Sequence, residues 1–336
     1  AIYQRATGLF YVKNTLQAAL QAQLAPLQAL AQGVYVQGAD VLGSEIGNIE
    51  GKGSNNWVVA GSHTTSGKPL LANDPHLGLS APAIWYFARL HVAGTATQSP
   101  AGTATQTVGT ATPEVDVIGA TLPGLPSVVL GRTAQVAWGF TNTGPDVQDL
   151  YLEQINPANP AQYKTPTGWA DFETRSETIK VKGQSDLQYA YRATRHGPVL
   201  SDAQAVHAEV LDLKKYVLAL RWSALDADNR TILAGMNGQK ARSVDELLTA
   251  YADYQSPMQN VVAADVSGKI AYKAIGKVPV RSADNDIKGI APAPGWEAKY
   301  DWAGWLPYAQ TPADDGTKGW VATANQRIHA ADYPHF

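Results

Sequence analysis

The chain has 336 residues, of which 45% are hydrophobic and 16% charged, so it can bury a sizeable core and intrinsic disorder is excluded. Its 26 lysine and arginine residues against 29 acidic ones give a formal net charge of −3, which excludes a broad basic surface for nucleic acid or an anionic membrane. The absence of cysteine excludes disulfides, zinc–thiolate sites, iron–sulfur clusters and thiol nucleophiles.

Membrane and targeting signals are both absent, and we expect the chain to be a processed or truncated piece of something larger. No apolar run approaches the roughly 20 residues that a membrane helix needs. The chain begins with alanine and has no basic segment followed by an apolar one, so we expect any targeting peptide to have been removed or to lie outside this sequence.

The first 53 residues differ from the rest. Leucines recur every fourth residue in 16–24 among alanine and glutamine, which predicts an amphipathic helix. Pro26 interrupts the stripe, so a kinked helix or two short ones are expected within 1–37. Residues 38–53 are rich in glycine and acidic side chains without a usable periodicity, which is typical of a linker.

Short strands separated by glycine and proline dominate after Ser54. We expect strands at 57–60, 115–118, 127–130, 216–222 and 269–272. Ser243 stands three residues before Glu246 and opens an apolar run, a capping box that predicts a helix ending before Pro257. The repeated Gly-Thr-Ala-Thr within 94–112 carries no charge and is expected to be an inserted surface loop. These patterns together predict a strand-rich α+β body.

The common catalytic signatures are absent. The sequence contains no Gly-x-Ser-x-Gly or His-Glu-x-x-His motif, no Walker loop, and no Gly-x-Gly-x-x-Gly after a strand. Its seven histidines are scattered without metal-ligand spacing, so each is expected to be structural rather than a ligand.

The junction before Ser54 offers another kind of nucleophile. The glycine-rich linker ends at this serine, where a strand of alternating character begins, and cleavage there would make Ser54 an N-terminus. An α-amine has a pKa of about 7.7–8.0, so it can take the proton of its own residue's hydroxyl directly or through one water. Ser54 would then be an activated nucleophile. The alternative is an ordinary turn that enters a strand.

An ordered set of motifs follows the junction. In one-letter code they are GSNNWVV at 53–59, KPLLANDPHL at 68–77, GATLPGLP at 119–126, AWGFTN at 137–142, RHGPV at 195–199 and LRW at 220–222. This set resembles the penicillin acylase (penicillin amidase) family of N-terminal nucleophile hydrolases, from Ser54 to about Asn325. The resemblance implies a four-layer αββα sandwich with extra strand-rich segments. It also implies that 1–37 is the helical end of a small chain, 38–53 a spacer, and 54–336 the first part of the large chain of a heterodimer.

The resemblance carries specific roles. It implies that a precursor cuts itself between Gly53 and Ser54, and that Ser54 is both the nucleophile and, through its new α-amine, the base. The oxyanion donors would be the side-chain amide of Asn260 and the backbone N–H of Asn142. The alternative for Asn260 is a turn or capping asparagine after the helix near Pro257.

Two more residues of the candidate site follow from the resemblance. The backbone carbonyl of His76 would orient the amine, so its imidazole would not be catalytic and a Ser54–His76–Asp74 triad would be a false lead. Arg281 would help to order the active site, and its alternative is an ordinary surface or salt-bridged arginine.

The resemblance also implies a calcium site. Asp146, the Gln148 carbonyl and Asp149 would supply oxygen ligands, which suit a hard cation with six to eight ligands at about 2.3–2.6 Å. A glutamate from the small chain would complete the site. The alternative is two aspartates that make turn and strand-start hydrogen bonds.

For the acyl group, Leu77 and Leu130 stand where penicillin G acylases carry aromatic rings. Leucines leave an aliphatic pocket, so fatty acyl groups are expected at least as much as phenylacetyl ones. We therefore expect a periplasmic or secreted acylase without an organic cofactor, acting on a non-peptide amide such as a β-lactam side-chain amide or an N-acyl homoserine lactone. Two alternatives stay open: a catalytically silent calcium-binding scaffold, and a carbohydrate-binding β-rich protein suggested by Trp296, Trp302 and Trp305.

Overall fold

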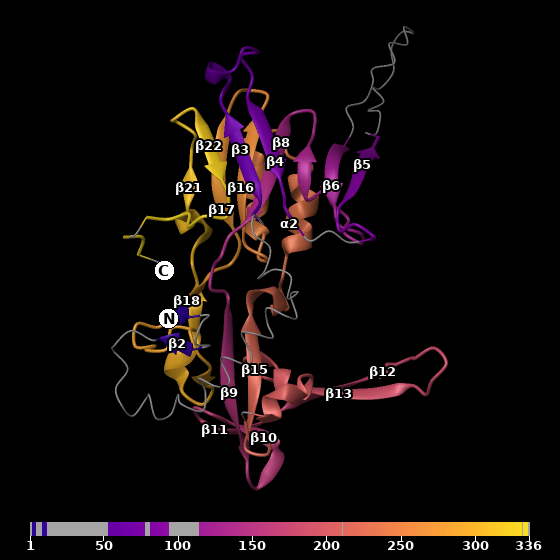
Figure 1. The fold of residues 1–336 in the computed structure, drawn as a ribbon, viewed down its shortest axis with the longest axis vertical. Coiled ribbons are helices and arrows are strands. Elements are labelled where there is room, and N and C mark those ends of the chain that lie inside the picture. Colours follow the sequence, from indigo (N-terminus) through magenta and orange to yellow (C-terminus); the bar gives the residue numbers. More distant parts are fainter. Residues whose placement is uncertain are drawn as a thin grey trace, which may run out of the picture. The chain divides into compact units, whose positions relative to one another are not determined.

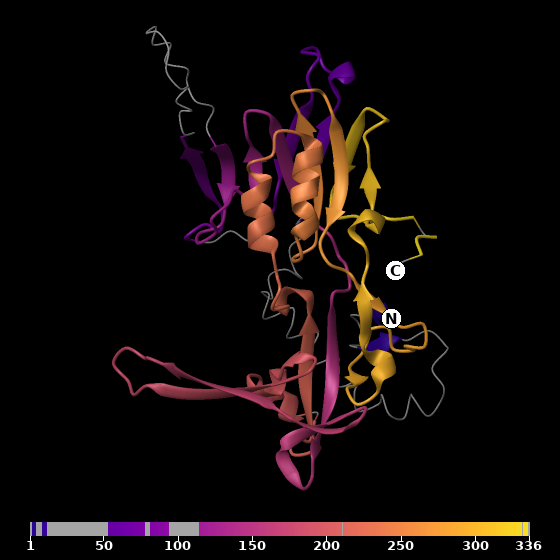
Figure 2. The same ribbon diagram turned by 180° about the vertical axis from the view of Figure 1, so that it is seen from behind.

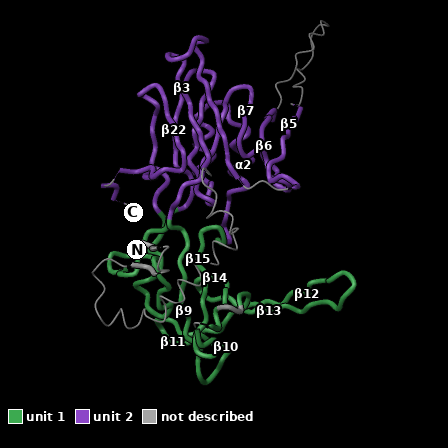
Figure 3. The backbone as a smooth tube through the Cα atoms, viewed as in Figure 1, with its two compact units in different colours: residues 1–49, 146–226, 278–305 green, residues 50–145, 227–277, 306–336 purple. Residues whose placement is uncertain are grey.

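The structure is a computed structural model. It describes residues 2–4, 9–11, 53–77, 81–93, 114–209, 211–330 and 332–334. The chain divides into two compact units, shown in green and purple in Figure 3: unit 1 is formed by 1–49, 146–226 and 278–305, and unit 2 by 50–145, 227–277 and 306–336. The helix expected within 1–37, the spacer at 38–53 and the Gly-Thr-Ala-Thr repeats lie wholly or almost wholly outside the described residues.

The described residues of unit 2 form two sheets. The larger has seven strands in the order β21 (Ala313–Asp314), β17 (Ile270–Ile275), β16 (Gln259–Asp265), β8 (Val136–Asn142), β7 (Leu130–Arg132), β6 (Val115–Thr121) and β5 (Tyr86–Val92). The smaller has the order β22 (Trp320–Thr323), β3 (Asn55–Val59) and β4 (Leu70–Asp74). All neighbours in both sheets are antiparallel.

Two helices cover the larger sheet on the face opposite the smaller one. They are α2 (Thr231–Gly238) and α3 (Val244–Ala250), which lie in front in Figure 2, whereas β22, β3 and β4 lie in front in Figure 1. The predicted capping box is confirmed, because the Ser243 hydroxyl accepts the N–H of Glu246 at 3.2 Å and satisfies one of the free N–H groups of the first turn. Unit 2 thus shows three layers: helices, the seven-stranded sheet and the three-stranded sheet.

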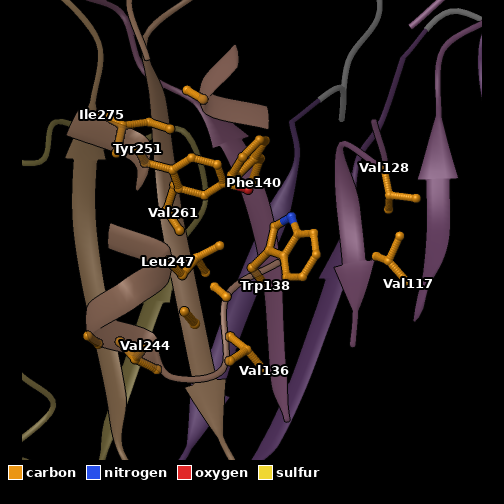
Figure 4. Close-up of a cluster of buried hydrophobic side chains, with 14 of the residues drawn as sticks. Val117, Val128, Val136, Trp138, Phe140, Val244, Leu247, Tyr251, Val261 and Ile275 are labelled. Atoms are coloured by element: carbon orange, nitrogen blue, oxygen red, sulfur yellow. The ribbon is translucent and has the colours of Figure 1, made fainter. Parts of the chain in front are cut away.

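The main hydrophobic core lies between the helices and the larger sheet. Figure 4 shows its side chains gathered there, and they include Val117, Val128, Val136, Trp138, Phe140, Val244, Leu247, Tyr251, Val261 and Ile275. Alternate residues of β8 contribute to it, as expected for a strand with one face on the core. The residues between them face the smaller sheet, and this second interface is unusually polar, with Asn56, Thr141, Asn260 and Thr323 all buried.

Unit 1 is also strand-rich. Its main sheet has the order β11 (Gly168–Asp171), β10 (Asn159–Thr165), β9 (Gln148–Asn156) and β15 (Tyr216–Trp222), with β19 (Ala293–Pro294) parallel to β9. Smaller sheets are β12 (Glu173–Ile179), β13 (Leu187–Thr194) and β14 (Gly197–Pro198); β18 (Pro279–Arg281) with β20 (Trp302–Trp305); and β1 (Ile2–Gln4) with β2 (Leu9–Tyr11).

The strand-rich α+β prediction is confirmed, and one strand prediction is wrong. Strand β7 begins at Leu130, whereas 127–129 form an irregular segment in which Val128 packs into the core. Burial there reflects packing of an irregular segment rather than a sheet, so apolar character alone misled the assignment. No helix in the described part of the chain is long and apolar enough to cross a membrane.

Candidate active site

Ser54 lies directly before β3, at the edge of unit 2's polar interface. It is buried, with 8% of its surface exposed, and its backbone N–H donates to the side-chain oxygen of Asn325 at 2.5 Å. A side chain at Gly53 would place its Cβ 3.3 Å from the same oxygen, so a glycine before the serine relieves crowding at this point. The local structure therefore places a partly exposed glycine before a buried serine, with an amide side chain beside the serine nitrogen.

Asn325 connects Ser54 to the larger sheet. It follows β22, and its other amide atom, Nδ2, donates to the backbone carbonyl of Asn142 at 2.8 Å. Its backbone φ of 61° is left-handed, a conformation that asparagine tolerates better than most residues. One exposed side chain thus joins the Ser54 nitrogen to the end of β8. Sequence reasoning missed Asn325 as a site residue.

The backbone N–H of Asn142 points away from β16, the strand with which Asn142 pairs. In an extended strand the N–H and C=O of one residue face the same edge. The Asn142 carbonyl accepts from Asn325, so the Asn142 N–H faces the same side of β8. This is the side on which β7 lies, and β7 leaves it uncovered here because the pairing of β7 with β8 stops at Trp138. Asn142 is exposed, and its side-chain oxygen accepts from Gln259 at 2.6 Å. The structure therefore brings Ser54 and Asn142 together through Asn325.

Asn260 occupies a different environment. It lies within β16, opposite Thr141, and is fully buried. Its Nδ2 donates to the Thr141 hydroxyl at 3.0 Å, and its Oδ1 accepts from the Tyr272 hydroxyl at 2.9 Å. Both polar atoms of this amide therefore have partners inside the protein. The structure therefore does not support Asn260 as an exposed donor, nor as a turn asparagine, and it presents Asn325 at Ser54 instead.

His76 follows β4 and is exposed. Its Nε2 lies 2.9 Å from an Asp74 carboxylate oxygen, with 42% and 61% of the two side chains exposed. In the described residues no hydrogen bond joins its imidazole to Ser54. Leu77 is 37% exposed and Leu130, at the start of β7, is half-buried, so the role of these two residues as an acyl pocket stays a prediction.

Asp149 and Arg281 form a buried ion pair in unit 1. The guanidinium donates through Nε and Nη2 to the two carboxylate oxygens at 2.9 and 2.6 Å, and Trp302 Nε1 adds a third donor at 2.6 Å. Asp146 joins this group at 3.2 Å from Arg281 Nη2. Burial raises the pKa of Asp146 to about 6 even though Arg281 opposes the shift. Arg281 is thus salt-bridged within unit 1, and its expected role in ordering the active site stays a prediction.

These residues, in this arrangement, do not fit a calcium ion. The Asp149 oxygens already accept three donors, and a guanidinium lies where the charge of a cation would be needed. Across the parts of the chain that the structure describes, no cluster of three or more His, Cys, Asp or Glu side chains could hold a metal. Gln148, whose carbonyl was the third expected ligand, is the first residue of β9 and pairs with Trp222.

The tryptophans that suggested carbohydrate binding do not form one platform. Trp302 and Trp305 meet edge to face with ring centres 5.3 Å apart, and the Arg221 guanidinium lies over both rings at 4.5 and 5.7 Å. Trp296 packs against Tyr216 instead. A cavity of about 280 Å³ lies beside Trp302, and its lining includes Tyr151, Arg195, His196 and Asp301. Because a cation covers the Trp302 ring, this face is not open for stacking on a sugar.

Comparison with known proteins gives a consistent result. The family model described as penicillin amidase matches residues 3–336. The acyl-homoserine lactone acylase QuiP of Pseudomonas aeruginosa is 32% identical over 286 residues, which are 83% of this chain and 31% of that protein. The penicillin acylase 2 proenzyme of Pseudomonas sp. strain SE83 is 30% identical over 323 residues, or 94% of this chain and 37% of that protein.

A solved structure agrees with these relatives. The thermostable penicillin G acylase from Alcaligenes faecalis has a TM-score of 0.67 and 28% sequence identity, over 83% of this chain and 45% of that one. The chain spans about a third of the length of the two curated relatives. The match to the family model over nearly all residues, together with these relatives, shows that the chain belongs to the penicillin amidase family.

Proposed function

We propose that this chain carries the nucleophile of an acylase that hydrolyses linear, non-peptide amides through an acyl-enzyme on Ser54. The observation that carries the proposal is the bridge in which Asn325 binds both the Ser54 nitrogen and the Asn142 carbonyl. This bridge supports the proposal because it links the serine that would supply the hydroxyl and the amine to a side-chain amide and to a residue at a strand edge. Acyl transfer needs groups of these kinds.

Cleavage of the Gly53–Ser54 bond is the first step of this proposal. Addition of water across that bond leaves a carboxylate on Gly53 and a free α-amine on Ser54. The amine stays beside Asn325 Oδ1, which already accepts the nitrogen's hydrogen in the intact chain and would keep its lone pair directed toward the serine hydroxyl. The family relative described as a proenzyme supports processing of this kind.

Acyl transfer then uses the same groups. The Ser54 oxygen attacks the carbonyl carbon of the substrate, and its proton passes to the α-amine. Negative charge develops on the carbonyl oxygen, where the Asn142 N–H and an N–H of Asn325 Nδ2 would donate. The C–N bond of the substrate breaks as the leaving amine takes the proton, and water hydrolyses the resulting ester. We assign the side-chain donor to Asn325 rather than Asn260 because Asn325 is exposed and adjacent to Ser54.

The substrate class follows from the relatives and two residues of this chain. Relatives are described as acyl-homoserine lactone acylases and penicillin acylases, and both names denote cleavage of an acyl amide on a small molecule. With leucines at positions 77 and 130, an aliphatic acyl group is expected at least as much as a phenylacetyl one. The rest of the acyl site would come from a partner small chain, and a periplasmic or secreted location fits a chain without cysteine.

The fold proposal is the full four-layer sandwich. The outer face of the three-stranded sheet carries Trp57, Leu70 and Trp320, with exposures of 42%, 53% and 55%. Alternation along β3 and β22 puts Trp57 and Trp320 on the face opposite the buried Val58 and Val321, and Leu70 of β4 lies beside Val59 on that same outer face. An apolar face of this kind normally packs against another layer, and a helical layer from the rest of the protein would complete the sandwich.

The test uses the full-length natural polypeptide. N-terminal sequencing of the purified protein should find a chain that begins Ser-Asn-Asn-Trp, and Ser54→Ala should abolish both this chain and hydrolysis of acyl anilides. Ser54→Cys is the matched control, because it keeps a nucleophile and should keep cleavage. Unchanged chain pattern and hydrolysis in Ser54→Ala would contradict the proposal.

A further inference from the structure

The end of β8 is held by polar side chains from other strands. Thr141 binds the hydroxyl of Thr323 at 2.9 Å, and Asn142 binds Asn325. Phe140 is bound through its backbone, and its partner is the side chain of Asn73, in β4. Neither the motifs nor the proposed chemistry gives Asn73 a role, although it makes more contacts to backbone than any other of these side chains.

Asn73 makes three hydrogen bonds, all to backbone. Its Oδ1 accepts the N–H of Phe140 at 3.1 Å, and its Nδ2 donates to the carbonyls of Phe140 and Asn55, both at 2.9 Å. The pair of bonds to Phe140 reproduces those that a residue of a neighbouring strand would make. These bonds lie where the pairing of β7 with β8 has ended. The Asn73 amide thus takes the place of a neighbouring strand along β8 and also binds β8 to β3.

Gly139 makes room for this contact. A Cβ on Gly139 would lie 2.7 Å from the Asn73 Cβ and 2.8 Å from its Cγ, and also 2.7 Å from the side-chain oxygen of Asn56. These distances are too short for any side chain, so a glycine is needed for the amide to reach the β8 backbone. The contact therefore depends on two residue types, an asparagine at position 73 and a glycine at position 139.

The contact lies between the two parts of the proposed active site. Asn55 directly follows Ser54, and Phe140 precedes Asn142 by two residues on the same strand edge. We propose that Asn73 is a positioning residue that sets the placement of Ser54 relative to the Asn142 N–H. The inference rests on the proposed function, and it adds a residue that does not itself touch the reacting atoms.

A positioning role has a kinetic signature. If the two strands shift, the attacking oxygen and the N–H donor lose their relative placement while the acyl pocket is unchanged, so kcat should fall and KM should change little. A displacement of about 1 Å at such a site costs on the order of 10²-fold in rate. A side chain that only added stability would lower the unfolding temperature and leave the rate per active site unchanged.

The test variant is Asn73→Asp in the full-length protein. Aspartate keeps the shape of the side chain and the oxygen that accepts the Phe140 N–H. A charged oxygen, however, replaces Nδ2 opposite the carbonyls of Phe140 and Asn55, and the repulsion should shift β4 relative to β8 and β3. Because those carbonyls disfavour the charged form, the new carboxyl should protonate above its usual range and donate again at acidic pH. The concentration of active sites is measured from the acyl-enzyme burst, and each rate is expressed per active site. Each rate is then divided by the wild-type rate at the same pH, so that the titration of the Ser54 amine cancels.

We expect this ratio to be about 10⁻² at about pH 8 and to recover roughly tenfold by about pH 5. Gly139→Ala should lower kcat similarly without recovery, since its added methyl group does not titrate. Asn285→Asp is the matched control: Asn285 is 2% exposed and accepts from the Ile287 and Lys288 N–H groups, which a carboxylate also does, so its ratio should stay near one.

Three outcomes separate the possibilities. A wild-type protein that is active, with an Asn73→Asp ratio near one or independent of pH, overturns the positioning role alone. A wild-type protein that is neither cleaved nor active overturns the proposed function and this inference with it. If Asn73→Asp accumulates uncleaved, its rate of cleavage before Ser54 replaces hydrolysis as the readout, with the same pH dependence expected and the same flat profile contradicting it.

Discussion

The side-chain oxygen of Asn325 accepts the backbone N–H of Ser54 at 2.5 Å, although the two residues are 271 positions apart in the chain. The remaining amide nitrogen of Asn325 binds the Asn142 carbonyl, so the side chain links the start of β3 to the end of β8. Asn73 makes a second link one residue further along β3. Two amide side chains thus fix the strand that carries the proposed nucleophile against the strand that carries the proposed N–H donor.

Asn325 and Asn260 should behave differently when replaced by alanine. Asn325 is exposed, so Asn325→Ala should fold normally and lose about 10²–10³-fold in kcat, as is typical when one oxyanion donor is removed. Asn260→Ala should instead destabilise the protein by about 1–3 kcal/mol, because the Thr141 and Tyr272 hydroxyls lose a buried partner. Burst kinetics and thermal unfolding of both variants make the comparison. A normal kcat in Asn325→Ala, with a loss in a stable Asn260→Ala, would return the donor to Asn260.

Arg281 should contribute to stability through Asp149. Arg281→Gln leaves the Asp149 carboxylate, whose side chain is 4% exposed, without its charged partner, and we expect a loss of about 3–5 kcal/mol in the free energy of unfolding. Denaturant unfolding measures this loss. Arg175→Gln is a suitable control, because its pair with Glu173 is exposed on both sides and should contribute little.

The same variant tests calcium at this position. In the wild type a calcium ion would have to displace the Arg281 guanidinium from Asp146 and Asp149. We therefore expect added calcium to raise the unfolding temperature more in Arg281→Gln than in the wild type. An equal or larger rise in the wild type would show that calcium and the guanidinium do not compete, and that the ion binds with Arg281 in place.

His207 should make the protein less stable in mild acid. It is 1% exposed, neither ring nitrogen has a hydrogen-bond partner in the described structure, and burial lowers its pKa below 6.5. The unfolded chain takes up a proton near its ordinary pKa of about 6.5, whereas the folded chain does so only at lower pH. The contribution of His207 to the free energy of unfolding should therefore decrease as the pH drops below about 6.5, and should become constant below the pKa of the folded state.

His207→Leu should remove that part of the pH dependence and leave stability at neutral pH equal or higher, since two unpaired polar atoms leave the interior. His91→Leu, at an exposed position of β5, should keep the wild-type dependence. Urea unfolding at a series of pH values compares the three proteins. A His207→Leu curve parallel to the wild type would show that other groups cause the acid sensitivity.

The sequence predicted local structure well where one strand or cap decided it. Strand 216–222 matches β15, and the Ser243 cap begins α3 as expected. Helix α2 was missed because its eight residues include Gly235 and Gly238, which weaken the helical pattern. The segment 127–130 was misread because Val128 is buried without being paired in a sheet.

The candidate site was only partly predictable. Motifs indicated Ser54 and Asn142, which are close to one another through a shared partner. Asn325 was missed because its importance comes from a contact between distant parts of the chain, which no local pattern encodes. Its only local signal is an asparagine two residues after an alternating strand, a residue type that tolerates the left-handed backbone it adopts there. Asn260 was chosen for its motif, whereas strand pairing buries it between the sheets.

The most direct test is the N-terminal sequence of the mature full-length protein combined with mass labelling by a slowly hydrolysed acyl ester. We expect a chain that starts at Ser54 and acquires one acyl group on that serine, with no labelling of Ser54→Ala. A single uncut chain, or a label on any other residue, would contradict the central claim that Ser54 is the N-terminal nucleophile.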